Sequence, residues 1–512
     1  MIGVSVNKDR FFYDIHSLVK AFYPGENVSC FVKGEKEIVS TAGSPSLSVD
    51  LREEIGEITV TLISPDGAGR TEDTRCLPMA EGERISSIDL QPVRDAAGER
   101  RYRAKNALKR LLYRMLSEET GKRLPWGSLT GIRPTHIPKT FLQAGWEETA
   151  ILAELTDTYF VSEEKARLAL EIAETERVLL SDAEYETGYS LYIGIPFCPT
   201  TCLYCSFPSY PLGMHQAQVE GYLDALESEM DYAAGAFRGK KLYTIYVGGG
   251  TPTTLTPAQS ERLLRAIEDR FDLSHVKEFT VEAGRPDSVT REKLEVLSRH
   301  PVTRLSINPQ SMQQKTLDLI GRLHSVEDVR SAYHLARECG DFHINMDLIL
   351  GLPGESARDV AATLSEIEAL RPDDLTIHAL AIKRGSRMQA MMETKGVSYP
   401  EFEDIEAAAR EARDAARRMG LSPYYLYRQK NIAGNYENTG YADLKKDAAG
   451  LYNVLINEDV HSIVALGAGA ISKCVRGSEV SRAENVKDLS QYLERTEEMI
   501  ERKRRLYGSS GS

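Results

Sequence analysis

Residues 190–207 read SLYIGIPFCPTTCLYCSF, and this stretch is the most informative part of the chain. A run rich in Ile and Tyr, typical of a buried strand, leads into Cys198, Cys202 and Cys205, which have the spacing Cys-x3-Cys-x2-Cys. Such close spacing can hold three thiolates around a soft metal centre. Three cysteines on a four-iron cluster leave one iron free for a small chelating ligand. A zinc site needs a fourth ligand, and no His or Cys follows within eight residues, so structural zinc and a redox dithiol are the less favoured alternatives.

Strands and helices alternate downstream of the cysteines. Six short runs rich in Ile, Val, Tyr and Phe are predicted to be strands: 190–197, 242–249, 278–283, 304–310, 342–351 and 373–380. Helical segments separate them, which predicts right-handed βαβ units and a parallel sheet. Six such units form an α/β fold of the partial (βα)6 barrel type, with its chemistry at the C-terminal ends of the strands.

The pattern changes on both sides of this barrel. We expect an N-terminal strand-rich α+β domain (1–95), a helical connector (96–183), the partial barrel (184–395), a C-terminal α+β domain that covers the substrate (396–506) and a flexible tail (507–512). Within the C-terminal domain, residues 430–442 are predicted to be a polar loop.

The composition excludes some classes of protein. Lys and Arg number 63 against 76 Asp and Glu, a net charge of −13, which argues against a general nucleic-acid binder. The longest uncharged stretch near the C-terminus, 462–472, is too short to span a bilayer, and Lys8 comes too early for a signal peptide. We therefore expect a cytoplasmic protein without a membrane span, and a monomer.

The cysteine loop and the motifs after it resemble the radical S-adenosylmethionine (SAM) superfamily, and within it the oxygen-independent coproporphyrinogen III oxidase family. The strings LYIGIPFCPTTCLYCSF, GGGTPTTL, FTVEA, LSINPQSM, IGRLH, NMDLILGLPGE and IHALAIKRGS match that family in order. The later strings LYRQKNIAGNYENTGYA and ALGAGAISK are similar to the HemZ-like subgroup. The resemblance covers residues 190 to about 475.

The resemblance implies a [4Fe–4S] cluster on Cys198, Cys202 and Cys205, with SAM chelated to the free iron. An electron from the cluster cleaves SAM in such enzymes and releases a 5′-deoxyadenosyl radical. The glycines at the end of the second strand let backbone amides approach SAM. The resemblance also implies a catalytic role for Tyr192. The implied SAM contacts are Tyr192, Tyr204, Gly249, Gly250, Thr251, Glu282, Gln310, Arg322, Asp347 and Ala381.

The resemblance also implies a tetrapyrrole substrate with four propionates. Anionic propionates need basic donors, and the candidates are Lys383, Arg384, Arg387, Arg428 and Lys430. The expected reaction is hydrogen abstraction from a propionate, loss of CO₂ to leave a vinyl group, and transfer of one electron to an acceptor. Repeated once, it converts coproporphyrinogen III to protoporphyrinogen IX. The partners would be a low-potential donor of the flavodoxin or ferredoxin type and an electron acceptor.

Three departures from the family keep other functions open. Gly194 stands where the family has histidine, Phe207 stands where the decarboxylase has a further cysteine, and the first 180 residues have no counterpart in that enzyme. The alternatives are a haem-binding chaperone on the same scaffold and another radical SAM enzyme acting on tetrapyrroles, such as a methyltransferase or a haem-opening enzyme.

Overall fold

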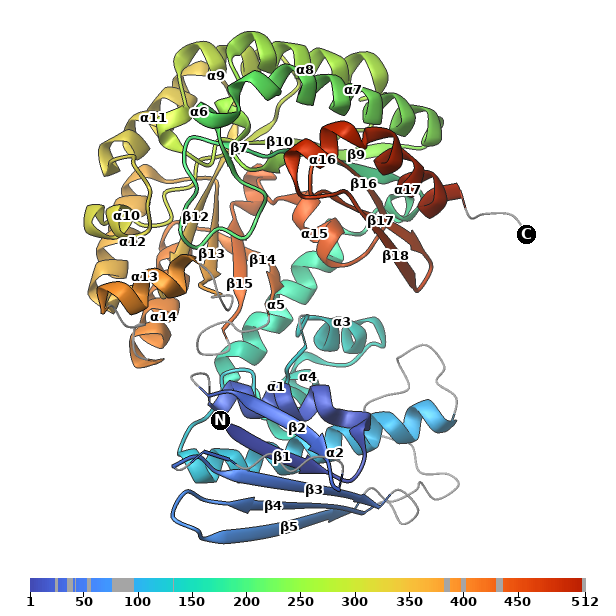
Figure 1. The fold of residues 1–512 in the computed structure, drawn as a ribbon, viewed down its shortest axis with the longest axis vertical. Helices are drawn as coiled ribbons and strands as arrows, with labels where there is room; N and C mark the ends of the chain where they lie inside the picture. Colours follow the sequence, from blue (N-terminus) through green and yellow to red (C-terminus); the bar gives the residue numbers. More distant parts are fainter. Residues whose placement is uncertain are drawn as a thin grey trace. The chain divides into compact units, whose positions relative to one another are not determined.

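The computed structural model describes the chain apart from residues 24–25, 35–39, 42, 53–56, 76–95, 132, 382–386, 397–401, 430–435 and 509–512. The chain divides into two compact units, both drawn in Figure 1. The first comprises Met1–Glu174 and Leu426–Glu437, and the second comprises Thr175–Tyr425 and Asn438–Ser512. The five-part division expected from the sequence is finer than this one and stays a prediction.

The first unit is built on a five-stranded mixed sheet with the order β2-β1-β3-β4-β5. Its strands are β1 (Ile2–Val6), β2 (Val28–Val32), β3 (Ser46–Arg52), β4 (Glu57–Ile63) and β5 (Gly69–Arg75). Every second residue of β3 and β4 is buried, as expected of strands with one face on a core. That core also takes in α1 (Phe12–Phe22) and α2 (Ala96–Thr120). The α+β character predicted for this region is confirmed.

A second core of the first unit surrounds the fully buried Trp126. It draws on α3 (His136–Gln143), α4 (Glu148–Ala153) and α5 (Glu163–Leu179). α3 begins inside the stretch 124–139, whose Gly and Pro content favours a loop or a domain hinge from sequence alone.

Six parallel strands form the centre of the second unit and are neighbours in sequence order. They are β6 (Tyr189–Ile195), β9 (Leu242–Gly249), β10 (Glu278–Glu282), β11 (Arg304–Ser306), β12 (His343–Leu350) and β13 (Asp374–Ala379). The helices between them include α7 (Val219–Ala236), α8 (Pro257–Arg270), α9 (Arg291–Ser298), α10 (Gln314–Leu319), α11 (Val326–Cys339) and α12 (Ala357–Leu370). Figure 1 shows these helices as an arc outside the strands. The predicted α/β partial barrel is confirmed.

The sheet continues beyond the six barrel strands at both edges. β15 pairs antiparallel with β13 and is followed by β14, whereas β16 runs parallel to β6 and is followed by β17 and β18. These strands are β14 (Ser422–Tyr427), β15 (Asn438–Ala442), β16 (Ser462–Leu466), β17 (Ile471–Arg476) and β18 (Glu479–Glu484). The remaining longer helices are α13 (Arg387–Lys395), α14 (Phe402–Arg418), α15 (Leu451–Asn457), α16 (Leu489–Glu494) and α17 (Thr496–Gly508).

β15 corrects the prediction of a polar loop over residues 430–442, because residues 438–442 form a strand. Its Asn and Gly residues have low strand propensity, but pairing with the edge of β13 overrides that preference. Gly440 is required there, since a Cβ at this position would lie 2.0 Å from the Tyr425 ring. Among the described residues, no helix is both long and apolar enough to cross a membrane.

Candidate functional site

The three cysteines lie on one loop at the C-terminal end of the first barrel strand. β7 (Phe197–Cys198) pairs with β8 (Tyr210–Pro211), and this pairing closes the loop that carries Cys202 and Cys205. Burial raises the pKa of the Cys205 thiol to about 11 and also raises the pKa of Cys198. Both thiols are therefore protonated at neutral pH in the metal-free chain, and ligation of a metal releases their protons.

The tip of this loop is anchored in an apolar cluster. The Leu203 N–H donates to the Ile320 carbonyl at 3.0 Å, just after α10. Leu203 and Tyr204 both pack against a cluster that includes Leu317 and Leu352. The residues between the second and third cysteines thus fix the loop on the barrel rim.

The glycine turn after β9 lies directly against the base of the cysteine loop. The Gly250 N–H donates to the Ile195 carbonyl at 2.8 Å, and the Thr251 N–H donates to the Phe197 carbonyl at 2.8 Å. A Cβ on Gly250 would lie 2.7 Å from the Ile195 oxygen, closer than real Cβ contacts allow. Gly249 has φ +101°, a left-handed conformation that favours glycine. The turn therefore exposes backbone where a side chain would block it.

Tyr192 and Glu282 meet beside this turn through Tyr246. The rings of Tyr192 and Tyr246 stack at 6.1 Å, and the Tyr246 hydroxyl donates to Glu282 Oε1 at 2.5 Å. Burial raises the pKa of Glu282 to about 7, although hydrogen bonds from Tyr246 and from the Gly249 N–H oppose the shift. Burial, and then the charge of Glu282, raises the pKa of Tyr192.

Asp347 faces the same interior. It interacts electrostatically with Glu282 although β10 and β12 are not adjacent strands, so both carboxylates lie on the inner face of the curved sheet. Asn345 Nδ2 donates to Asp347 Oδ1 at 2.7 Å, and His378 Nε2 lies 3.7 Å from Oδ2. Burial raises the pKa of Asp347, but contacts led by His378 outweigh it, and the net pKa is lowered. The site thus pairs an ionised Asp with a Glu that titrates near neutrality.

Gln310 and Arg322 complete the rim. Gln310 adopts φ +66°, and its backbone bonds to both Asp347 and Ile349 of β12. Arg322 is buried and donates to the carbonyls of Asn308 and Gly284. Its Nε is a buried donor without a hydrogen-bond partner among the described residues.

The predicted SAM contact Ala381 and two of the predicted substrate contacts lie in the described part of the chain. Ala381 is partly exposed just after β13, and Arg387 is exposed at the start of α13. Arg428 is buried in the first unit and donates to the Leu129 carbonyl at 2.7 Å. Lys383, Arg384 and Lys430 lie outside the described residues. The SAM contact of Ala381 and the substrate roles of the other residues stay predictions.

Sequence reasoning missed Tyr246, His378 and Arg285. Tyr246 and His378 stand on predicted strands, and their polar character among apolar neighbours was an available signal. Arg285 follows the third strand and carries no signal of its own, because its target is a loop 83 residues away.

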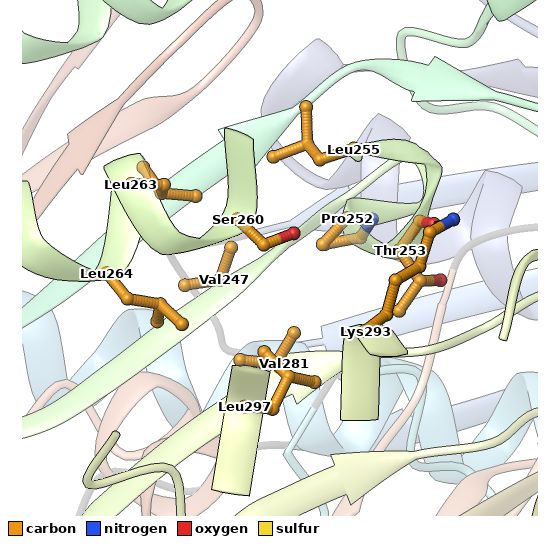
Figure 2. A pocket seen from close by; sticks show the side chains of 10 residues that line it. All are labelled: Val247, Pro252, Thr253, Leu255, Ser260, Leu263, Leu264, Val281, Lys293 and Leu297. Carbon is orange, nitrogen blue, oxygen red and sulfur yellow. The ribbon is translucent and has the colours of Figure 1, made fainter. Parts of the chain in front are cut away.

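A small cavity near this region is not the cofactor site (Figure 2). It has a volume of about 20 Å³ and lies between β9, β10, α8 and α9. Its lining is mainly aliphatic, and Lys293 is the one charged residue among the described residues that line it. Val247 and Val281 point into it, so it lies on the helix-covered face of the strands, away from the inner carboxylates.

The inner site fits both implied cofactors. One loop supplies three thiols, and the glycine turn leaves space that a Cβ would fill. The two inner carboxylates and the unpartnered Arg322 Nε match the amino, hydroxyl and carboxylate groups of SAM. The individual contacts with SAM stay predictions.

Comparison with known proteins places this site in a family. The model of the radical SAM superfamily matches residues 192–367. The chain is 40% identical over 405 residues to the oxygen-independent coproporphyrinogen-III oxidase-like protein HemZ of Bacillus subtilis, which covers 78% of this chain and 80% of that protein. It is 35% identical over 216 residues to the heme chaperone HemW of Bacillus subtilis, covering 41% of this chain and 55% of that one.

The coproporphyrinogen III oxidase HemN of Escherichia coli has a similar fold. Its solved structure aligns with a TM-score of 0.50 at 24% identity, over 64% of this chain and 72% of that chain. The cofactors of this chain are a [4Fe–4S] cluster and SAM. With three cysteines in one loop, a glycine turn against it and a relative matched over four-fifths of its length, the chain belongs to the radical SAM superfamily and, within it, to the HemZ-like family of coproporphyrinogen III oxidase-like proteins.

Proposed function

We propose that this protein is an oxygen-independent oxidative decarboxylase that converts two propionates of coproporphyrinogen III to vinyl groups, giving protoporphyrinogen IX. For each propionate, the substrate loses a hydrogen atom from the β-carbon, CO₂ and one electron. The bound cluster and SAM supply the radical that takes the hydrogen atom. An external acceptor takes the electron, and a low-potential flavodoxin or ferredoxin reduces the cluster.

The extent of the similarity to HemZ carries this proposal. It covers 78% of this chain, far more than the radical SAM match at 192–367, whereas the similarity to HemW covers 41%. Radical SAM enzymes share the barrel, so specificity for a substrate depends on what surrounds it. A relative that also matches outside the barrel is therefore the better guide to the substrate.

The chain's own groups have separate roles in this proposal. The backbone of Gly249 and Gly250, with Glu282, holds the methionine part of SAM, and Asp347 accepts hydrogen bonds from its ribose. Arg387, exposed beyond β13, pairs with a substrate propionate. Tyr192, stacked on Tyr246, limits solvent beside the reacting groups.

A haem chaperone is the second candidate, and one observation favours it. Phe207 follows the last cysteine and is 66% exposed, where the decarboxylase pattern has a cysteine. An exposed aromatic ring beside the cluster could contact a flat porphyrin.

The test is anaerobic turnover of the full chain. The cluster is reconstituted, SAM, a reductant and coproporphyrinogen III are added, and 5′-deoxyadenosine, CO₂ and vinyl porphyrin are followed together. Cys202→Ser removes a cluster ligand, and Cys339→Ser, on α11, is the matched control that should keep activity.

The outcomes separate the candidates. Vinyl product formed in step with deoxyadenosine supports the decarboxylase. Tight haem binding without substrate-stimulated formation of deoxyadenosine would contradict the decarboxylase and support the haem chaperone. Stimulated deoxyadenosine without CO₂ would indicate another radical reaction on tetrapyrroles.

A further inference from the structure

Arg285 reaches from the end of β10 to the cysteine loop. It is 2% exposed, and its Nη1 lies 3.0 Å from Thr200 Oγ1, 3.2 Å from the Thr200 carbonyl and 3.7 Å from Cys202 Sγ. Its Nε and Nη2 each donate to Asp287 at 3.1 Å. The guanidinium fork thus fixes one edge on a carboxylate and directs the other edge at a cluster cysteine.

Cys202 is the cysteine of the loop on which Arg285 and Arg322 both act. Besides Arg285, the buried Arg322 interacts with the Cys202 thiol. Cys198 receives a neutral hydrogen bond from Thr251 Oγ1 at 3.4 Å and interacts electrostatically with Arg285, as Cys205 does with Arg322. Two buried guanidinium groups therefore converge on one of the three ligands.

The groups around Arg285 leave a net positive charge. Asp287 offsets one of the two arginines, and it is itself 25% exposed at its side chain. His324 Nδ1 lies 4.0 Å from Asp287, but burial, with Arg322 and Arg285, lowers its pKa to about 3. The imidazole is neutral at physiological pH and does not alter this balance.

A hydrogen-bond chain holds the backbone of Arg285 in place. Ser288 Oγ donates to the Arg285 carbonyl at 2.6 Å and lies 2.6 Å from Thr253 Oγ1. Lys293 Nζ donates to the carbonyls of both Thr253 and Ser288, at 2.5 and 3.0 Å. Figure 2 shows Lys293 extending beside Thr253. The loops after β9 and β10 are therefore tied together, and Arg285 is pre-organised toward the cysteine loop.

We propose that Arg285 is a positioning and potential-tuning residue that donates a hydrogen bond to the Cys202 thiolate and favours the reduced cluster. Reduction adds one electron to the cluster and no proton, so its negative charge increases. A buried guanidinium on a ligand sulfur stabilises that extra charge, since hydrogen bonds to cluster sulfurs raise the potential.

The test compares midpoint potentials of reconstituted full-length variants, from anaerobic titrations followed by the electron paramagnetic resonance of the reduced cluster. In Arg285→Gln we expect iron and sulfide contents close to wild type. At a fixed solution potential we expect the ratio of reduced to oxidised cluster to fall about tenfold, a shift of about 59 mV to more negative potential. Arg285→Lys keeps the charge but loses the guanidinium fork. Its midpoint potential should therefore lie between those of wild type and Arg285→Gln.

Arg291→Gln is the matched control. Arg291 lies 3.8 Å from Cys339 Sγ and bonds to Glu338, so the same change is made beside a cysteine outside the loop. Its potential should equal wild type. An unchanged potential in a cluster-loaded Arg285→Gln protein would overturn the proposal.

If Arg285→Gln does not retain a cluster, Asp287→Asn tests the tuning role of Arg285 instead. This nearly isosteric change leaves the charge of Arg285 unopposed, so the potential should shift in the opposite direction, to less negative values. A potential equal to or below wild type in Asp287→Asn would refute a tuning role for Arg285.

Discussion

The hydroxyl of Tyr246 and the carboxylate of Glu282 join two neighbouring barrel strands through a 2.5 Å hydrogen bond. Burial raises the pKa of Glu282 from 4.5 to about 7. Between these values the folded chain holds a proton that the unfolded chain has lost. The contribution to stability is therefore complete below about pH 4.5 and is lost as the pH rises through about 7.

Glu282→Gln should remove this pH dependence from the cofactor-free protein. The separation between the two pKa values corresponds to roughly 3 kcal/mol of unfolding free energy at alkaline pH. We expect the variant to gain stability over wild type at pH 8 and to differ little at pH 4.5, measured by urea unfolding. Tyr246→Phe keeps the carboxylate and should keep the pH dependence. Parallel stability curves for wild type and Glu282→Gln would show that Glu282 does not titrate in this range.

Gly250→Ala tests the contact between the glycine turn and the cysteine loop. The new Cβ would lie 2.7 Å from the Ile195 oxygen and 2.8 Å from the Phe197 oxygen, and backbone atoms at both positions must shift. We expect a loss of about 1–3 kcal/mol of stability, typical of overpacking, together with reduced iron retention after reconstitution.

Gly221→Ala is the control for that substitution. Gly221 lies in α7, and a Cβ there meets nothing within 4 Å. The change should stabilise the protein by about 0.5–1 kcal/mol, because alanine favours a helix over glycine. Full iron content in Gly250→Ala with wild-type stability would mean that the turn adapts freely.

The barrel and its order of motifs could be predicted from the sequence because both are local signals. Apolar runs of strand length, separated by helical segments, predicted the six strands from β6 to β13, and the cysteine spacing predicted a cluster loop. β15 could not be predicted, because its stability comes from pairing with β13 and not from its own residues.

Long-range polar contacts could not be predicted from the sequence for the same reason. Arg285 and Cys202 are 83 residues apart, and only the parallel order of β6, β9 and β10 brings their loops together. His378 approaches Asp347 because β12 and β13 are paired in one register, which no linear motif encodes.

Arg304 and Asp374 form a buried ion pair whose rupture should be costly. The Arg304 guanidinium donates to Asp374 and to the Ala448 carbonyl, and the Tyr424 hydroxyl donates to Asp374 at 2.8 Å. Arg304→Met leaves the carboxylate buried without its cation, and we expect a loss of about 3–5 kcal/mol in urea unfolding. The double variant Arg304→Met/Asp374→Leu should recover most of the stability that Arg304→Met loses.

Arg505→Met is the surface comparison for that pair. Arg505 is 77% exposed at its side chain and pairs with Glu501, so its loss should cost less than about 1 kcal/mol. Equal costs for Arg304→Met and Arg505→Met would contradict the importance of the buried pair.

His378→Phe should move the acid limit of SAM binding, given the proposed contact of Asp347 with SAM. The net pKa of Asp347 is lowered because contacts led by His378 outweigh burial. A carboxylate of this kind is ionised above its lowered pKa and loses its charge as the pH falls through it. Without His378 the pKa rises, so SAM affinity should fall about tenfold at pH 5 and change little at pH 8, where Asp347 is ionised in both proteins. Calorimetric titration with SAM at the two pH values measures this, and His343→Phe, at the start of β12, is the control. An equal loss at both pH values would mean that His378 touches SAM itself and does not act through Asp347.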